Sequence, residues 1–174
     1  IIRESLQANK ISKIMGIING TTNYILTKMT EEDLTFEMAL QQAKELGYAE
    51  PDPTADIEGF DAMYKLSILA SLSFQTQVSI EDIYREGITG IGKEDIQYAK
   101  ELGYIIKLAA IAKKTDDGIE ARVHPTFIPE KHPLASVRDS FNAVFVNGDA
   151  IGEMMFYGQG AGDMPTGSAI VSDI

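Results

Sequence analysis

Residues Tyr104 to Ile128, YIIKLAAIAKKTDDGIEARVHPTFI, decide the fold class that the sequence predicts. Two apolar runs flank the polar segment TDDG, and a short polar segment ending in Asp-Gly is typical of a β-turn. We therefore expect a β-hairpin, although the alanines of the first run would also suit a helix. A second hairpin is predicted over residues 141–158, FNAVFVNGDAIGEMMFYG, around Asn147-Gly148.

The sequence ahead of the first hairpin predicts one strand followed by several helices. KISKIMGIIN, residues 10–19, is typical of a buried strand, and Gly20 should close it. A helix should follow, with Thr21 or Thr22 as its N-cap. Further helices are predicted over residues 35–47, 59–74, 79–87, 93–103 and 132–140. On the apolar side of the 59–74 helix we expect Phe60, Met63, Tyr64, Leu66, Ile68 and Leu69.

The order of these elements indicates the fold class. One strand and several helices precede hairpin, helix and hairpin, so helices and hairpins are segregated along the chain. That order favours an α+β fold, a mixed or antiparallel sheet with helices covering one face, over a doubly wound parallel sheet. No repeat or long linker interrupts the chain, so we expect a single domain over residues 1–174.

The composition excludes several classes of site. A formal net charge of −11 argues against binding to nucleic acid or an anionic membrane surface, and a cationic or zwitterionic small ligand fits better. The chain has no cysteine, which excludes disulfides and cysteine nucleophiles, and its two histidines give little basis for a zinc site. The longest uncharged stretch, residues 66–80, is too short and too polar for a membrane span. We expect a soluble protein.

A cluster of charge lies in EPDPTADIEGFDAMYK, Glu50 to Lys65, which holds five carboxylates and one lysine. A calcium loop is excluded because Lys65 would occupy the twelfth place, where a bidentate glutamate is required. Two interpretations stay open: a solvated turn followed by an ordinary i,i+4 pair, or a binding loop made rigid by its two prolines. Carboxylates suit an ammonium group, and Lys65 suits an oxygen that gains or loses a proton. Together they indicate an amino acid that bears a second reactive oxygen.

Two glycine-containing segments allow similar alternatives. In FYGQGAGDMPTGSAI, residues 156–170, three glycines precede a helix expected to start near Pro165 or Thr166. The segment is either a tight turn or one edge of a nucleotide-binding site. The remainder of such a site would lie elsewhere, because no complete Rossmann unit can follow this segment. In GIINGTTNYIL, residues 16–26, the glycine and threonines either start a helix or present backbone amides to a substrate carboxylate.

The run AKELGYAEPDPTADIEGFDAMYK, Ala43 to Lys65, resembles the signature of the homoserine dehydrogenase family. GIINGTTNYIL and GQGAGDMPTGSAIVSDI resemble the segments that flank this signature, so the resemblance covers essentially the whole chain. It implies NAD- or NADP-dependent interconversion of L-homoserine and L-aspartate 4-semialdehyde, in threonine and methionine biosynthesis. This substrate is an amino acid with a second reactive oxygen.

The resemblance also implies a role for individual residues. Lys65 matches the proton donor. Glu50 and Asp61 match acidic residues that hold the substrate, with Asp56 in support. The remaining matches are the site wall, Thr21, Tyr48 and Gly160, and backbone contacts to the nicotinamide nucleotide, Gly47 and Gly162.

The family's organisation implies that residues 1–174 are a catalytic domain for substrate binding and dimerisation in a cytoplasmic homodimer. The chain starts without methionine and stops within an apolar helical pattern, so we expect both ends to be cut from a longer chain. The nucleotide-binding domain, any regulatory domain and the family's alkali-metal loop would lie outside it. We therefore expect no metal site and no activity from this segment alone. The alternative is a non-catalytic amino-acid-binding or dimerisation module. Aldehyde dehydrogenases that need a cysteine nucleophile are excluded.

Overall fold

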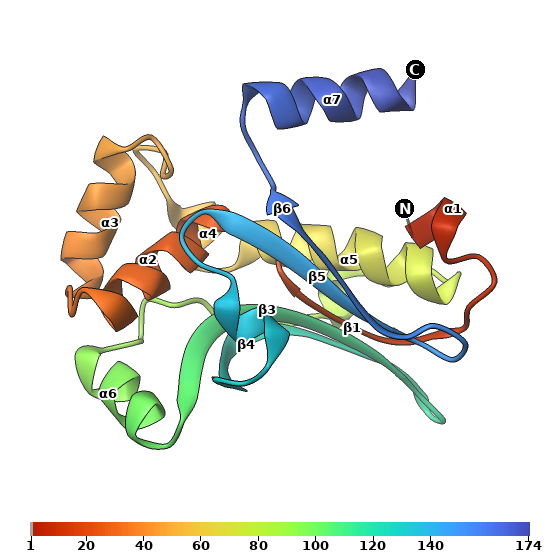
Figure 1. Ribbon diagram of the computed structural model, residues 1–174, viewed down its shortest axis with the longest axis horizontal. Helices are drawn as coiled ribbons and strands as arrows, with labels where there is room; N and C mark the ends of the chain where they lie inside the picture. Colours follow the sequence, from red (N-terminus) through yellow and green to blue (C-terminus); the bar gives the residue numbers. More distant parts are fainter. Residues whose placement is uncertain (1) are drawn as a thin grey trace.

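A computed structural model describes residues 2–174 and contains one six-stranded sheet with the order β2-β4-β3-β1-β5-β6 (Figure 1). The strands are β1 (Ile11–Ile17), β2 (Tyr84–Arg85), β3 (Tyr104–Thr115), β4 (Gly118–Pro129), β5 (Phe141–Gly148) and β6 (Gly152–Gln159). The helices are α1 (Ile2–Ser5), α2 (Gly20–Glu31), α3 (Phe36–Glu45), α4 (Thr54–Ile57), α5 (Phe60–Phe74), α6 (Lys93–Glu101) and α7 (Asp163–Asp173), with 3-10 turns η1 (Ile80–Asp82) and η2 (Pro133–Ser136). All strand pairs are antiparallel except β2 with β4, so the sheet is mixed and the predicted α+β class is confirmed.

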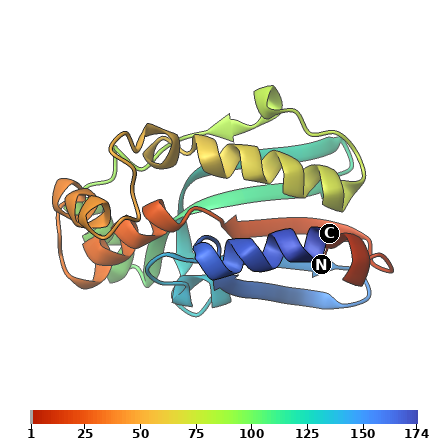
Figure 2. The ribbon, with the colours of Figure 1, turned by 90° about the horizontal axis from the view of Figure 1, so that it is seen from above.

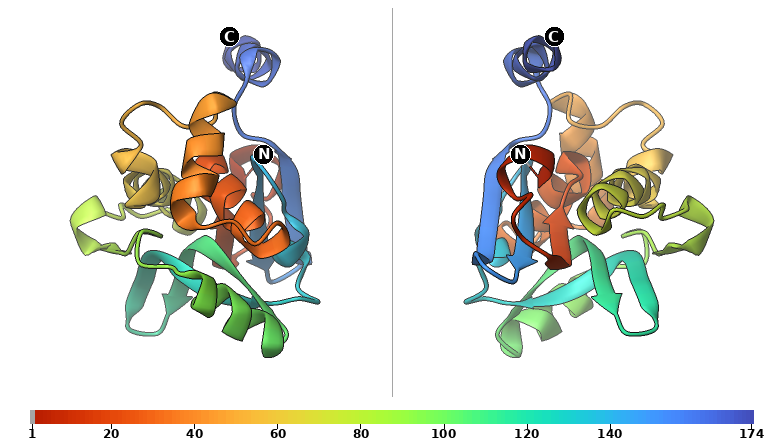
Figure 3. Two further views of the ribbon diagram at one scale, coloured as in Figure 1. Left: turned by 90° about the vertical axis from the view of Figure 1, so that its left-hand side faces the viewer. Right: turned by 90° about the vertical axis from the view of Figure 1, so that its right-hand side faces the viewer.

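The main core lies between the sheet and the helices above it. Side chains alternate across each strand, so Ile14 of β1 and Val146 of β5 face the helices while Met15 faces the opposite side. α2 and α5 lie on the same side of the sheet (Figure 3), and α5 runs over β3 and β4 (Figure 2). Their buried side chains, including Ile25 and Leu66, complete this core. The helices cover one face, as the sequence predicts.

Local sequence signals set the helix ends, but the predicted N-cap of α2 has to be corrected. Thr35 caps α3 as predicted, because its side chain accepts from the backbone N–H of Met38. The expectation that Thr21 or Thr22 caps α2 is wrong. Asn19 caps it instead: its backbone is extended and its side-chain oxygen accepts from Thr22 N at 2.8 Å. Asn is among the strongest N-cap residues, which explains why the helix begins two residues earlier than a cap at Thr21 would give.

The predicted helix over residues 79–87 is also wrong. This segment forms the 3-10 turn η1 and the short strand β2, because its backbone after η1 bonds to distant parts of the chain. Glu86 N donates to Val123 O and Ile88 N donates to Ile57 O, both at 2.8 Å. At Gly87, a Cβ atom would lie 2.4 Å from Ile57 O, so the chain passes here only without a side chain.

Three boundaries differ in smaller ways. The helix expected over residues 132–140 is reduced to η2. Asn147 and Gly148 pair inside the ladder of the second hairpin, with Glu153 and Gly152, so its turn falls at residues 149–151. α7 begins at Asp163, ahead of the expected start, and lies apart from the sheet (Figure 1).

The buried side of α5 also differs from the predicted one. Met63 and Leu66 are buried and Phe60 and Leu69 pack against the core, but Tyr64 and Ile68 are exposed. The buried residues Leu66, Ala70 and Phe74 recur every four positions, and residues 64 and 68 fall on the opposite side of a 3.6-residue helix.

Lys107 is a buried lysine that joins three elements. Its side chain on β3 is 2% exposed, and its Nζ donates to Asn23 Oδ1 on α2 at 2.9 Å and to Val137 O at 2.7 Å. Asn23 Nδ2 in turn donates to the carbonyls of Val137, Asp139 and Phe141. This network fixes the segment between η2 and β5 against α2.

Burial lowers the pKa of Lys107 from 10.5 to about 8. Between these two values the unfolded chain holds a proton that the folded chain lacks, so stability rises with pH. Relative to Lys107→Met, the wild type should gain about 2 kcal/mol in free energy of unfolding between pH 7.5 and 9.5. Urea unfolding at both pH values measures this gain, with Lys113→Met, an exposed position on the same strand, as the control. A difference that stays constant with pH would contradict the prediction.

Candidate active site

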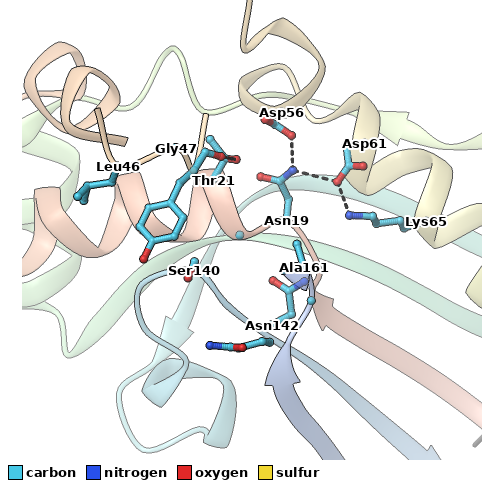
Figure 4. Close-up of a pocket in the computed structure, with 15 residues that line it drawn as sticks. Asn19, Thr21, Leu46, Gly47, Asp56, Asp61, Lys65, Ser140, Asn142 and Ala161 are labelled. Carbon is cyan, nitrogen blue, oxygen red and sulfur yellow. Dashed lines mark hydrogen bonds and ion pairs between the residues drawn. The ribbon is translucent and has the colours of Figure 1, made fainter. Parts of the chain in front are cut away.

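A cavity of about 500 Å³ opens where the N-terminus of α2 meets α4, α5 and the segment between β6 and α7 (Figure 4). Three walls enclose it, one charged and two largely uncharged. Its lining residues are Asn19, Gly20, Thr21, Leu46, Gly47, Tyr48, Asp56, Asp61, Lys65, Ser140, Asn142, Gln159, Gly160, Ala161 and Gly162. They come from segments more than 100 residues apart in the chain.

The charged wall is a chain of hydrogen bonds. Asn19 Nδ2 donates to Asp56 Oδ1 at 2.6 Å and to Asp61 Oδ2 at 2.9 Å. The same Asp61 oxygen accepts from Lys65 Nζ at 2.7 Å, and Lys65 Nζ also donates to Ile18 O at 3.1 Å. Within residues 2–174, Asp61 Oδ1 and Asp56 Oδ2 accept no hydrogen bond. Two carboxylate oxygens are therefore available to a ligand.

The local sequence explains how these groups meet. Gly59 adopts φ 81°, a left-handed conformation that lets the chain turn from α4 directly into α5. Asp56 lies on α4, and Asp61 and Lys65 lie four residues apart on the first turns of α5, on one side of the helix. All three side chains thus face the end of β1, where they form hydrogen bonds with Ile18 and Asn19.

Lys65 is held by Asp61 and Ile18 O and can still reach a ligand. Its side chain is 47% exposed and that of Asp61 is 31% exposed, so water screens the pair and its contribution to stability is small. An ammonium has three hydrogens, and Asp61 and Ile18 O take two of them. The third hydrogen can be donated to an oxygen in the cavity.

The second wall is the turn after α3. Thr21 Oγ1 donates to Tyr48 O at 2.6 Å, which fixes this turn against the start of α2, and the Tyr48 ring packs 5.0 Å from that of Tyr24. Gly47 has φ 77°, and a Cβ atom there would have no neighbour within 4 Å. Gly47 therefore ends α3 through its backbone conformation and leaves its surface open to a ligand.

The third wall is formed by the start of β5 and the segment after β6. A Cβ atom at Gly160 would lie 1.8 Å from Asn142 Nδ2, so Asn142 fills the space beside this glycine. Asn142 Oδ1 is buried and has no partner among the described residues. Gly162 adopts φ 124°, a conformation that favours glycine, directly before α7.

The structure brings together all but one of the residues that the sequence singled out. Thr21, Gly47, Tyr48, Asp56, Asp61, Lys65, Gly160 and Gly162 line the cavity. Glu50 does not line it and its side chain is exposed. Sequence reasoning missed Asn19, Ser140, Asn142 and Gln159. A signal existed only for Asn19, which precedes the Gly-Thr-Thr helix start as a strong cap residue.

Residues 2–174 contain neither a metal-binding cluster nor a membrane-spanning helix. No group of three or more histidine or acidic side chains is arranged to hold a metal ion in the part of the chain that the structure describes. None of the described helices combines the length and the apolar character that crossing a membrane requires.

Solved structures of known proteins share this fold. A homoserine dehydrogenase from Thiobacillus denitrificans superimposes with a TM-score of 0.97 at 51% identity, over 99% of this chain and 40% of that one. A hyperthermophilic archaeal homoserine dehydrogenase mutant in complex with NADPH gives a TM-score of 0.82 at 32% identity, over 99% of this chain and 49% of that one.

Sequence comparisons agree with the structural ones. Homoserine dehydrogenases of Bacillus subtilis and Neisseria gonorrhoeae are 51% and 53% identical over 173 residues, which is 99% of this chain. The chain spans about 40% of the length of these relatives. The family model described as homoserine dehydrogenase matches residues 1–174, and the chain therefore belongs to the homoserine dehydrogenase family.

Proposed function

We propose that this chain supplies the substrate-binding and proton-transfer part of an NAD- or NADP-dependent homoserine dehydrogenase, which interconverts L-homoserine and L-aspartate 4-semialdehyde in threonine and methionine biosynthesis. The observation that carries the proposal is the Asp61–Lys65 pair in the cavity. It places an ammonium donor beside carboxylate oxygens that accept no hydrogen bond within residues 2–174. An amino acid with a reactive oxygen on its side chain fits both groups.

The residues of the charged wall have separate roles in substrate binding and proton transfer. Asp61 Oδ1 and Asp56 Oδ2 accept hydrogen bonds from the substrate ammonium, because both oxygens are unused within the described chain. Lys65 donates its third hydrogen to the side-chain oxygen. In the reductive direction Lys65 gives this oxygen a proton as the aldehyde becomes a hydroxyl. Thr21 and Tyr48 bound the space on the other side, and Glu50 would act from outside the cavity.

The third wall and Gly47 suit the nicotinamide end of a dinucleotide. The lining there is uncharged, Asn142 Oδ1 has no partner in the described part of the chain, and Gly47 and Gly162 expose backbone without side chains. NAD or NADP, when bound, exchanges a hydride with the carbon that carries the reacting oxygen. Gly47, Gly162 and the Gly160 segment would hold its nicotinamide. The archaeal homoserine dehydrogenase in complex with NADPH supports a nicotinamide dinucleotide as the cofactor.

The remaining organisation is also a proposal. Residues 1–174 would form the catalytic and dimerisation domain, with nucleotide binding supplied by other parts of a longer chain, since the relatives are more than twice as long. The sheet face opposite the helices carries an apolar cluster with η2, in which Met15, Ile111 and Phe145 are buried and Ile105, Phe141 and Met155 are only partly buried. A second copy of the chain would cover the partly buried side chains in a cytoplasmic homodimer.

A steady-state assay tests the proposed function. A full-length protein that includes residues 1–174 should reduce NAD or NADP when supplied with L-homoserine, measured by absorbance at the nicotinamide band. L-serine, whose hydroxyl lies one carbon closer to the ammonium, should give much lower turnover because it cannot reach both Asp61 and Lys65. Residues 1–174 alone should show no turnover. No homoserine-dependent reduction by the full-length protein would refute the proposal.

A further inference from the structure

Asn19 joins the two acidic residues of the cavity. Its side chain lies between β1 and α2, is 5% exposed, and uses every hydrogen-bonding group that an amide has. Its Nδ2 donates to Asp56 and Asp61, and its Oδ1 accepts from the backbone N and the Oγ1 of Thr22, both at 2.8 Å. One amide thus connects α2, α4 and α5.

This network fixes the orientation of the amide. The backbone N–H of Thr22 can only donate, so the amide oxygen must face α2 and the amide nitrogen must face the carboxylates. The nitrogen can only donate, so the facing oxygens of Asp56 and Asp61 both act as acceptors. Asn19 is also the only side-chain partner of Asp56 within residues 2–174.

The charges around Asn19 make this bridge important. Asp56 faces it from α4, and Asp61 with Lys65 face it from α5; Lys65 is the one cation among the residues that line the cavity. Both carboxylates approach a single nitrogen, at 2.6 and 2.9 Å, so they lie close enough to repel each other. Two donated hydrogen bonds offset this repulsion and set where each carboxylate lies.

We propose that Asn19 is a positioning residue of the active site. It fixes the Asp61 carboxylate and thereby the direction of the Lys65 ammonium, whose two protein acceptors are Asp61 and the neighbouring Ile18 O. Asn19 does not touch the reacting atoms. The inference rests on the proposed function, because it concerns how the same site holds its proton donor.

Asn19 also caps α2, so the test must separate capping from bridging. Asn19→Ser keeps a cap oxygen and removes the amide that joins the carboxylates. Asn19→Asp keeps the cap and places a third carboxylate against Asp56 and Asp61. Thr22→Val removes the hydroxyl on the capping side and leaves the bridge to both carboxylates intact. Thr22 does not line the cavity.

The variants are compared in the full-length protein by kcat, by KM for L-homoserine and for the nicotinamide cofactor, and by thermal unfolding. We expect Asn19→Ser to lower kcat at least tenfold and Asn19→Asp about a hundredfold, with the cofactor KM within twofold of wild type. Thr22→Val should keep kcat within threefold even where its unfolding temperature falls.

Two results would overturn the inference. In one, Asn19→Ser retains the wild-type kcat. In the other, kcat in all three variants falls only in step with thermal stability, which would show a purely structural role. Either result requires an active wild type and so leaves the proposed function standing. A wild type that does not turn over homoserine would instead refute the proposed function, and the inference with it.

Discussion

Lys65→Ala in the full-length protein is expected to lower kcat by about 10²- to 10⁴-fold, the range that a positioned proton donor contributes. The structure gives the reason: Lys65 is the cation of the cavity, and one of its hydrogens is not taken by Asp61 or Ile18 O. Alanine removes the donor and leaves the rest of the cavity in place. Stopped-flow or steady-state measurement of homoserine-dependent nicotinamide reduction gives the value.

Two further variants make this result specific. Lys65→Arg keeps a cation beside Asp61, but a guanidinium does not release its proton at ordinary pH, so kcat should stay low while KM for homoserine changes little. Lys44→Ala removes a partly exposed lysine of the same sequence run, whose Nζ donates to Pro51 O, and should leave kcat near wild type. If Lys65→Ala changed only the affinity for homoserine, the chain would be a binding module and not a catalytic one.

The second large effect is expected from Asp61→Asn. The change keeps the shape of the side chain but removes its negative charge. That charge pairs with Lys65, and it strengthens the hydrogen bond that Asp61 Oδ2 accepts from Asn19. The amide oxygen can still accept from both donors, but it carries no full negative charge, and the amide nitrogen that replaces Oδ1 cannot accept from the substrate ammonium. We expect kcat to fall about 100-fold and KM for homoserine to rise about tenfold, because Asp61 both orients the donor and holds the substrate ammonium.

The matched control for Asp61→Asn is Glu58→Gln. Glu58 belongs to the same acidic stretch but lies outside the cavity, where its side chain accepts from Thr89 and lies near Arg85. The kcat and KM of the Glu58→Gln variant should stay within about threefold of wild type, since the solvent-screened pair of Glu58 and Arg85 contributes little. Equal losses in the two variants would mean that the net charge of the stretch matters and that the position of Asp61 does not.

Local signals predicted the elements that depend on local interactions. The hairpin of β3 and β4, the capped helix α3 and the Asp61–Lys65 pair each follow from residues close together in the sequence. The same signals failed at residues 79–87, where good helix-forming residues are held by backbone bonds to Val123 and Ile57. Such long-range bonds override helix propensity and leave no mark in the sequence.

The candidate site shows the same difference between residues placed by local interactions and residues placed by long-range ones. Asp56, Asp61 and Lys65 could be selected together because a single turn at Gly59 orients them. Ser140 and Asn142 could not, because only the folding of β5 against β1 brings them to the cavity. Glu50 shows the opposite case: it is close to these residues in the sequence, yet the structure leaves its side chain exposed and outside the cavity.

The most direct test of the account is the position of L-homoserine in a crystal structure of the full-length protein bound to this amino acid. The account predicts that the side-chain hydroxyl lies about 2.7–3.2 Å from Lys65 Nζ. It also predicts that the ammonium contacts Asp61 Oδ1 or Asp56 Oδ2. Homoserine bound outside this cavity, or with its hydroxyl more than about 4 Å from Lys65 Nζ and no bridging water, would contradict the assignment of Lys65 as the proton donor.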